Sequence, residues 1–295
     1  MKRALISALA LAGTMSMAEA KPFDEMFPGH EGYDQPEVME ALRALDYQQG
    51  TIELPGGQVV LDVPEGYYYL DSEDANIVLS YLWGNPESYT LGMIFPANAT
   101  PWDDAWGLEM TFDEIGYVSD DDADSYDYDD LLKTMQADTR IESRYRVEDG
   151  YDSVELLNWA EPPKYDVTER KLHWAQELNF GGAEVNTLNY NLRALGREGV
   201  LVVNFIASIE QLQEVKTALP DVSNMISYQE GKRYMDFDPS IDTVAAVGIG
   251  GLIAGKALSK KGGLIAAALI LLKKFWFILL LPFFWLKSLF RRQSA

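Results

Sequence analysis

The chain has 295 residues, a formal net charge of −22 and no cysteine. Nucleic acid and anionic lipid head groups repel a domain of this charge, so neither is expected as a ligand of its acidic part. Without disulfide bonds the fold must rest on a hydrophobic core, and the chain is long enough to form one. Its two histidines, His30 and His173, are too few for a zinc site made of His and Cys ligands.

The first 20 residues have the form of a secretory signal peptide. A basic start, Met1-Lys2-Arg3, precedes an apolar stretch from Ala4 to Thr14 and the small-x-small sequence Ala18-Glu19-Ala20. Cleavage at this site makes Lys21 the first residue of the exported chain. The alternative is an uncleaved N-terminal anchor, and in both cases the following residues are exported.

Residues 21–49 are predicted to be an acidic, poorly ordered lead-in with one weak helix from Pro36 to Leu45. The exported domain is expected to occupy residues 50–240. It opens with a hairpin, because two alternating segments flank the turn sequence Pro55-Gly56-Gly57. The first unit is expected to contain strands at 51–54, 58–63, 90–95 and 106–112, and a helix capped by Asp71 that runs to Trp83.

The most acidic stretch comes next, and three of its residues copy part of a calcium loop. Asp120, Asp122 and Asp124 match the first three ligand positions, but Ser125 stands where the turn needs glycine and Leu131 where it needs a bidentate glutamate. Two interpretations stay open. Either the aspartates complement the N-terminus of the following helix, whose dipole favours negative charge, or they bind a divalent cation.

The second unit is predicted to be a four-strand antiparallel meander with helices. Residues 161–166 are expected to form a stiff turn in it, because Pro162 and Pro163 fix φ and exclude helix. A capping box, Ser208-x-x-Gln211, starts the last helix, which ends before Pro220. The other expected elements are a helix at 127–148 and strands at 151–160, 171–180, 188–194 and 200–206.

A polar cluster is the better candidate for a binding site. Its members come from the proline turn and from the polar faces of the next two strands, which are expected to lie together: Glu161, Tyr165, Asp166, Glu177, Asn189 and Asn191. The alternative is that these side chains stiffen the turn and pair across strands. No nucleophile elbow, zinc-protease motif or phosphate-binding glycine loop is present, so no catalytic residue and no cofactor is assigned.

Residues 241–292 are predicted to be a membrane segment. From Thr243 onwards the chain has eight basic residues and no acidic one, with apolar runs at Thr243–Leu258 and Leu264–Leu286. The preferred arrangement is one span made mainly of the first run, which contains Gly251-x-x-x-Gly255, followed by an interfacial helix. A two-span hairpin and a hairpin buried in a soluble core are the alternatives.

Five motifs are spread over most of the chain from Gly50 to the tail: Asp127-Tyr128-Asp129-Asp130-Leu131-Leu132, Trp159-Ala160-Glu161-Pro162-Pro163-x-Tyr165-Asp166, Lys171-Leu172-x-Trp174-Ala175-x-Glu177-Leu178, Asn186-Thr187-Leu188-Asn189-Tyr190-Asn191 and Phe237-Asp238-Pro239-Ser240-x-Asp242. Together they resemble an uncharacterised bacterial family of predicted membrane-anchored proteins, grouped as a domain of unknown function. The resemblance implies a signal peptide, an exported α+β domain and a C-terminal anchor. It implies no reaction.

The sequence therefore predicts an α+β fold, with a mostly antiparallel sheet and several helices, followed by a C-terminal transmembrane anchor. The expected location is the bacterial inner membrane, with the soluble domain facing the periplasm. The expected partners are the lipid bilayer, through the tail, and an unknown envelope protein, but no nucleic acid. Three functions stay open: non-catalytic binding of a protein or envelope component, a divalent-cation-responsive sensor, and a carboxylate-dependent envelope hydrolase.

Overall fold

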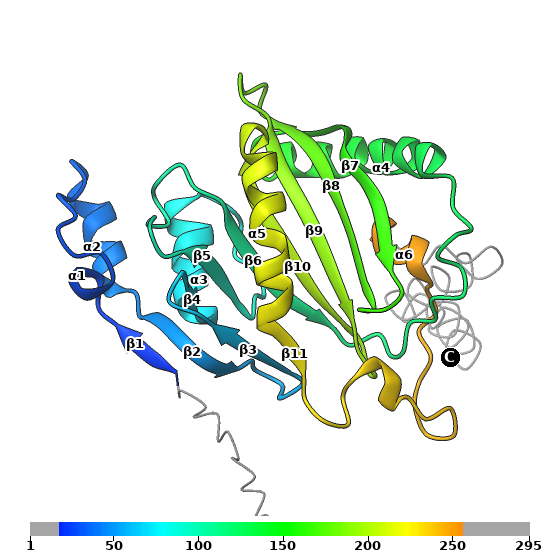
Figure 1. Ribbon diagram of the computed structural model, residues 1–295. Helices are drawn as coiled ribbons and strands as arrows, with labels where there is room; N and C mark the ends of the chain where they lie inside the picture. Colours follow the sequence, from blue (N-terminus) through cyan, green and yellow to red (C-terminus); the bar gives the residue numbers. More distant parts are fainter. Residues whose placement is uncertain (1–17, 256–295) are drawn as a thin grey trace, which may run out of the picture.

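Eleven strands form one sheet in the computed structural model, which describes residues 18–255 (Figure 1). The strands are β1 (Glu19–Lys21), β2 (Tyr47–Glu53), β3 (Val59–Val63), β4 (Tyr67–Leu70), β5 (Gly92–Pro96), β6 (Gly107–Asp113), β7 (Val154–Asp166), β8 (Lys171–Phe180), β9 (Thr187–Leu195), β10 (Val200–Ser208) and β11 (Ile226–Tyr228). Their order is β11-β3-β2-β4-β5-β6-β10-β9-β8-β7, and β1 pairs with β2 outside this path. The predicted α+β class with a mostly antiparallel sheet is confirmed.

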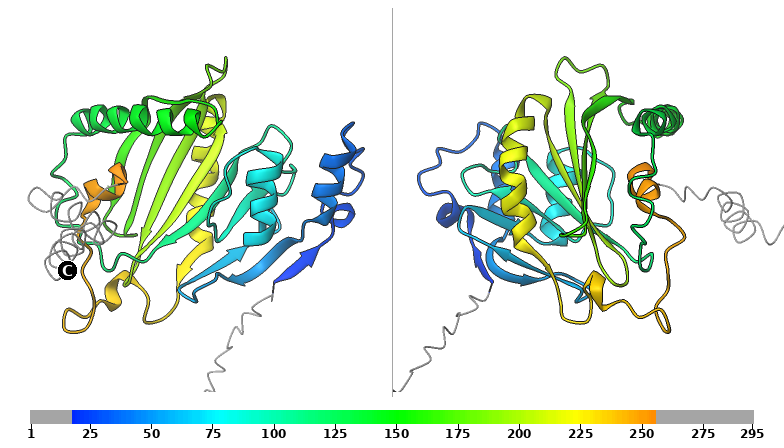
Figure 2. Two further views of the ribbon diagram at one scale, coloured as in Figure 1. Left: turned by 180° about the vertical axis from the view of Figure 1, so that it is seen from behind. Right: turned by 45° about the vertical axis from the view of Figure 1, so that its right-hand side comes forward.

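Helices cover both faces of this sheet (Figure 2). They are α1 (Phe23–Met26), α2 (Pro36–Ala44), α3 (Ser72–Asn76) continued by the π-helical η1 (Ile77–Leu82), α4 (Tyr128–Glu148), η2 (Ile209–Gln211), α5 (Leu212–Met225), η3 (Tyr234–Asp236) and α6 (Ile249–Ala254). One core lies under α5, a second packs α1, α2 and α3 on β2, β4 and β5, and a third packs α4 and α6 on β7, β8 and β9. The face under α4 and α6 is opposite to the face under α5 (Figure 2).

The segment 21–49 is part of the packed domain, so the prediction of a poorly ordered lead-in is wrong. Phe23, Leu42 and Tyr47 are at most 2% exposed in the second core. The Tyr47 hydroxyl donates a hydrogen bond to the Leu42 carbonyl at 2.7 Å. The predicted helix is confirmed as α2, which begins at Pro36. A few aromatic and aliphatic side chains among many acidic ones are enough to fill this core.

Two strands differ from the expected elements. β4 is not among the predicted strands, because Tyr68, Tyr69 and Leu70 are all buried and the run shows no alternation. β7 continues to Asp166, so the predicted stiff turn at 161–166 is wrong. Its prolines fall at a register shift between Glu161 and Lys164. β7 is also an edge strand of the sheet. Proline, which has no N–H to donate, is tolerated in an edge strand.

The first apolar run of the tail packs against the domain. Ile249, Leu252 and Ile253 of α6 are at most 7% exposed in the third core, and Gly255 ends the helix in a left-handed conformation with φ 64°. In this structure α6 is thus part of the packed domain, and the rest of the predicted span, residues 256–258, lies outside the described residues. Among residues 18–255, no helix is both long and apolar enough to cross a bilayer. The second apolar run and the first 17 residues of the predicted signal peptide lie outside the described residues.

Candidate functional site

A cavity of about 950 Å³ opens where the β7–β8 turn, the end of α5 with β11, and η3 meet. Three cationic side chains line it, from Arg170, Lys171 and Arg233, and Glu169 is the only carboxylate among its lining residues. We call it the cation-lined cavity. This local excess of positive charge is opposite in sign to the chain as a whole, whose net charge is −22.

Asp120 holds one wall of the cavity together. It forms an ion pair with Arg170, and its carboxylate accepts hydrogen bonds from the hydroxyls of Tyr165 at 2.7 Å and Tyr234 at 3.0 Å. Burial alone would raise the pKa of Asp120, but these hydrogen bonds and the charge of Arg170 hold it below its usual range. Asp120 is therefore a charged acceptor that binds three side chains from three different segments.

Arg170 has an unusual backbone conformation. Its φ is 56°, and it is the one non-glycine residue in the described part of the chain with a positive φ. Such a conformation costs energy and persists only where surrounding contacts fix it. Here the Leu195 N–H donates to the Arg170 carbonyl at 2.9 Å, and the guanidinium carbon lies 4.9 Å from the ring centre of Tyr234. The strained turn thus places a cation on the wall of the cavity.

Aromatic rings form a second wall. Tyr117 stacks on Phe237, with ring centres 3.9 Å apart and planes 17° apart, and its other neighbour is Tyr234 at 4.5 Å. The backbone of Tyr117 is fixed as well, because its N–H donates to the Thr243 carbonyl at 2.9 Å and its carbonyl accepts from the Ala245 N–H at 2.8 Å. The chain leading to α6 therefore crosses behind this wall.

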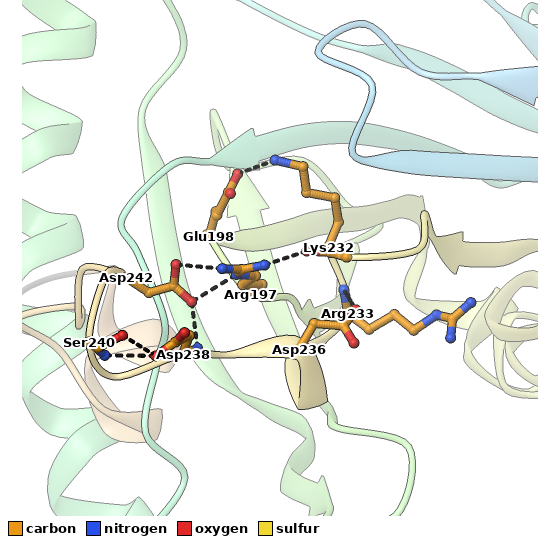
Figure 3. Close-up of polar contacts among 9 residues, drawn as sticks. Arg197, Glu198, Lys232, Arg233, Asp236, Asp238, Ser240 and Asp242 are labelled. Atoms are coloured by element: carbon orange, nitrogen blue, oxygen red, sulfur yellow. Dashed lines mark hydrogen bonds and ion pairs between the residues drawn. The ribbon is translucent and has the colours of Figure 1, made fainter.

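The segment that carries Arg233 is fastened by the β9–β10 turn (Figure 3). Arg197 donates through Nε and Nη2 to the two oxygens of Asp242, at 2.8 and 2.9 Å, and Lys232 pairs with Glu198 at 2.7 Å. The hydrogen bonds from Arg197 hold the pKa of Asp242 below its usual range. The side chain of Arg233 points away from this network in Figure 3, and it forms no ion pair with any of residues 18–255.

Lys171 and Ser223 lie close enough to be compared with a catalytic serine and its base. The Lys171 ammonium donates to the Ser223 hydroxyl at 2.5 Å and to the Ser223 carbonyl at 3.0 Å, and it pairs with Glu169 at 3.2 Å. A serine nucleophile needs a neighbouring base that accepts its proton. Here the Lys171 ammonium donates to the Ser223 hydroxyl, and that hydroxyl donates to the Glu169 carboxylate at 3.4 Å. The contacts fit a lysine that binds the end of α5.

The structure does not bring the predicted polar cluster together. Residues paired across neighbouring strands share a face, and Glu177 is paired with Leu188 whereas Asn189 is paired with Gln176. The polar side of β8 and the polar side of β9 therefore lie on opposite faces of the sheet. Glu177 accepts from Asn186 at 2.6 Å, and Asn191 donates to Asn189 at 2.6 Å, so each stays in a local contact.

The three predicted residues from β7 also separate. Glu161 lies on the α5 face between Lys164, at 2.8 Å, and Lys216, at 2.7 Å. Asp166 accepts from the backbone N–H groups at the start of the β7–β8 turn and is exposed. Only Tyr165 reaches the cation-lined cavity, through its hydrogen bond to Asp120.

The three aspartates of the calcium-like stretch do not converge. Asp120 binds Arg170, Asp122 accepts from the Tyr126 hydroxyl and from the Ile249 N–H, and Asp124 is exposed. No group of three His, Cys, Asp or Glu side chains is placed to hold a metal ion within the described range 18–255.

The helix that follows this stretch begins as the sequence predicts. The side chain of Asp127 caps α4 by accepting from the N–H groups of Asp129 and Asp130, at 3.0 and 3.1 Å.

The residues that line the cavity were absent from the predicted site, although a signal for them exists. Between Lys21 and Asp242 the chain has two places where basic residues are adjacent, Arg170-Lys171 and Lys232-Arg233, and both contribute to the cavity. In a chain with 24 basic and 46 acidic residues, these two pairs are places where positive charge is concentrated within residues 21–242.

Fold and cavity together define an α+β domain with a cation-lined cavity and no assigned reaction. A family model described as "Protein of unknown function (DUF2167)" matches residues 46–284, and the chain belongs to this family. No curated protein matches the sequence. Among solved structures, the chain is similar to the solution structure of cyanobacterial PsbP (CyanoP) from Synechocystis sp. PCC 6803, at 9% identity and a TM-score of 0.32, over 76% of this chain and 99% of that one. A likeness this distant carries no argument about function.

Proposed function

We propose that the protein is a non-catalytic binding domain, exported and held at the membrane, whose cation-lined cavity binds an anionic group of an envelope component. The observation that carries this proposal is the gathering of Arg170, Lys171 and Arg233 around one cavity in a strongly acidic chain. Arg170 and Lys171 are paired with Asp120 and Glu169, whereas Arg233 has no carboxylate partner among residues 18–255. An anionic ligand would supply a partner for Arg233 in a cavity whose lining is cationic.

The cavity has the features of a small-ligand site. Its volume of about 950 Å³ lies within the usual range for such sites, and it combines an apolar aromatic wall with a few charged groups. Arg233 has no carboxylate partner in the described part of the chain, and its planar guanidinium suits a carboxylate or a phosphate. Tyr117 and Phe237 offer a stacked surface for the apolar body of the same ligand.

The proposed location rests on both ends of the sequence. Residues 1–20 have the form of a secretory signal peptide, and the run Leu264–Leu286 is apolar except for Lys273 and Lys274 and is flanked by basic residues. An exported acidic domain with such a tail is held at the membrane surface, facing the periplasm, where envelope components are its available ligands.

The contacts of the acidic side chains favour binding over the two other functions. A carboxylate-dependent hydrolase needs an acid that can exchange a proton, and Glu161 is held between two lysines that keep its pKa below the usual range. A cation sensor needs carboxylates that converge on one point, and Asp120 and Asp122 bind different partners.

Site-specific photocrosslinking in living cells tests the proposal. Met235 is 83% exposed on the rim of the cavity, and Tyr81, which is 62% exposed, does not line it. A benzophenone amino acid at position 235 is expected to give a discrete adduct, and the same group at position 81 is not. Equal adducts from both positions, or none from either, would contradict the proposed site.

A matched pair of charge variants tests the anionic nature of the ligand. Arg233→Gln is expected to remove most of the adduct formed from position 235, because it removes the unpaired cation of the cavity. Arg140→Gln removes an exposed cation from α4 and is expected to leave that adduct unchanged. If both variants retain the adduct, the ligand is not recognised through its charge.

A further inference from the structure

Arg193 on β9 is a cation without a counter-ion. Its Nη1 donates to the Leu192 carbonyl and to the Asn204 side chain, both at 3.1 Å, and its Nη2 donates to the Asn191 side chain at 3.1 Å. All of these acceptors are neutral. Among residues 18–255, no carboxylate forms an ion pair with Arg193, although the chain has 46 acidic residues. The residue is half-buried, and a cation that is largely removed from water is normally paired, so this arrangement leaves room for a partner.

The environment of Arg193 favours such a partner. Burial lowers the pKa of Arg193 to about 10, and the charge of Asp113 opposes this only in part. Such a shift means that the charged form has lost hydration that its contacts do not replace. Glu109 lies on the same face, opposite Asn204 in the register of β6 and β10, but it forms no ion pair with Arg193.

Part of the Arg193 guanidinium is unused. Nε has no acceptor among the described residues, and Nη2 has one, Asn191. Nε and Nη2 form the fork, the edge of the guanidinium that binds two oxygens of one anion side by side. Arg197 shows the fork in use, because its Nε and Nη2 bind both oxygens of Asp242. In Arg193 the Nη2 end of this fork contacts Asn191, and the Nε end has no acceptor among the described residues.

Trp174 adds a second, independent observation. Its ring centre lies 4.8 Å from the guanidinium carbon of Arg193, and the residue is 1% exposed. Its indole N–H is buried without an acceptor in the described part of the chain. A buried N–H without an acceptor is destabilising, because no hydrogen bond offsets its loss of water. Two neighbouring side chains on the same face of the sheet thus each have an N–H group without an acceptor among the described residues.

We propose that a small oxyanion with two adjacent oxygens, a carboxylate or a phosphate, binds at Arg193 and Trp174 on the sheet face under α4 and α6. The Nε–Nη2 edge of Arg193 binds two of its oxygens, and the indole N–H of Trp174 is a further donor. This oxyanion site is distinct from the cation-lined cavity, because none of Arg193, Trp174, Asn191 and Asn204 lines that cavity. It does not depend on the proposed function.

NMR of the tryptophan indole groups tests the oxyanion site directly. The full-length protein, labelled with ¹⁵N and held in an uncharged maltoside detergent, is titrated at constant ionic strength with sodium phosphate, sodium formate or sodium chloride. Trp174→Phe identifies the resonance of Trp174. We expect this resonance to shift saturably with phosphate or with formate, and not with chloride. The anion that acts at the lower concentration identifies the phosphate or the carboxylate as the preferred ligand.

Variants separate the oxyanion site from other effects of salt. Arg193→Gln is expected to abolish the shift, and Arg193→Lys, which keeps the charge but not the fork, is expected to lose most of it. Arg197→Gln and Arg233→Gln are expected to leave it intact, because these arginines belong to other contacts. If phosphate and formate leave the wild-type resonance unmoved, or if the shift survives in both Arg193 variants, the oxyanion site is refuted. Loss of the shift in Arg233→Gln would assign it to the cavity instead.

Discussion

The carboxylate of Asp122 accepts a hydrogen bond from the backbone N–H of Ile249 at 3.1 Å, so the acidic stretch is fastened to the first residue of α6. The Tyr126 hydroxyl donates to the same carboxylate. This approach requires glycine, because a Cβ at Gly248 would collide with Asp122 and a Cβ at Gly250 would collide with the ring of Tyr126. The glycines of this apolar run therefore serve packing within the domain.

The contact between Gly250 and Tyr126 leads to the first prediction. Gly250→Val is expected to lower the free energy of unfolding by about 1–3 kcal/mol, because the new side chain must displace the Tyr126 ring. Equilibrium unfolding of the full-length protein in urea, followed by tryptophan fluorescence, measures the change. The control is Gly66→Ala, since a Cβ at Gly66 would meet no atom within 4 Å and the φ of Gly66 is not positive. A Gly250 variant as stable as the control would contradict the packing of α6.

Burial of α6 gives the second prediction. Ile253 is 2% exposed in the third core, and Ile253→Ala is expected to lower the free energy of unfolding of the domain by about 2–4 kcal/mol. Val244→Ala, at a residue that is 56% exposed, is expected to change it by less than about 0.5 kcal/mol. Both are measured by urea unfolding. If residues 243–258 formed a membrane span, the two variants would leave the unfolding of the domain equally unaffected.

Local hydrogen bonds made several elements predictable from the sequence. Asp71 caps α3, as predicted, by accepting from the N–H groups of Glu73 and Asp74 at 2.9 and 3.1 Å. The predicted capping box is present too, with Ser208 and Gln211 at the start of the last long helix. Each of these signals lies within four residues of the chain, so the residue types alone reveal it.

The faces of β8 and β9 were not predictable in this way. Each strand alternates as expected, but Trp174 is paired with Asn191, so the apolar side of β8 lies on the face where β9 is polar. Helices cover both faces of the sheet, and both therefore bury apolar residues. Which side of each strand faces which helix is set by the register between strands. That register is non-local, and so the predicted polar cluster separated.

The cation-lined cavity depends on non-local contacts even more. Asp120, Tyr165, Arg170 and Tyr234 come from four segments, and only the folded chain places them around one carboxylate. The sequence predicted Asp120 and Tyr165 as members of two different sites. The adjacent basic pairs were the available signal, and the overall acidity of the chain hid it.

Asp74 gives a prediction in which the mutation stabilises the protein. Burial, together with the charges of Asp71, Asp46 and Glu73, raises the pKa of Asp74 from 3.8 to about 6, although the Asp46 N–H donates to it at 2.9 Å. The folded state therefore binds more protons than the unfolded chain between about pH 4 and pH 6, and stability falls as pH rises through this window. At neutral pH the charged carboxylate is a net cost.

Asp74→Asn removes that charge and keeps an acceptor for the Asp46 N–H. We expect it to raise the free energy of unfolding by about 1–3 kcal/mol at pH 7, because one pKa unit corresponds to about 1.4 kcal/mol. The gain is expected to disappear below about pH 4, where the wild-type side chain is neutral as well. Urea unfolding at several pH values measures both, with the exposed Asp62→Asn as control. A variant less stable than wild type at pH 7 would show that the charge is compensated.

Glu161 provides the opposite pH dependence. It is buried at 7% exposure, with Lys164 and Lys216 at 2.8 and 2.7 Å from its two oxygens. Burial alone would raise the pKa of Glu161, but the hydrogen bonds and charges of the two lysines hold it below 4.5. The folded state then binds fewer protons than the unfolded chain, so this stabilisation is complete above about pH 4.5 and is lost as pH falls through the lower folded value.

Glu161→Gln is therefore expected to lower the free energy of unfolding by about 2 kcal/mol at pH 7, because it leaves Lys164 and Lys216 facing each other without the carboxylate. The difference from wild type is expected to shrink as the pH falls below about 4.5, since the wild-type carboxyl becomes neutral there. Urea unfolding at pH values on either side of this point measures the trend, and Glu37→Gln, at an exposed residue of α2, is the control. A deficit that stays constant down to strongly acidic pH would mean that Glu161 contributes through its shape and not through its charge.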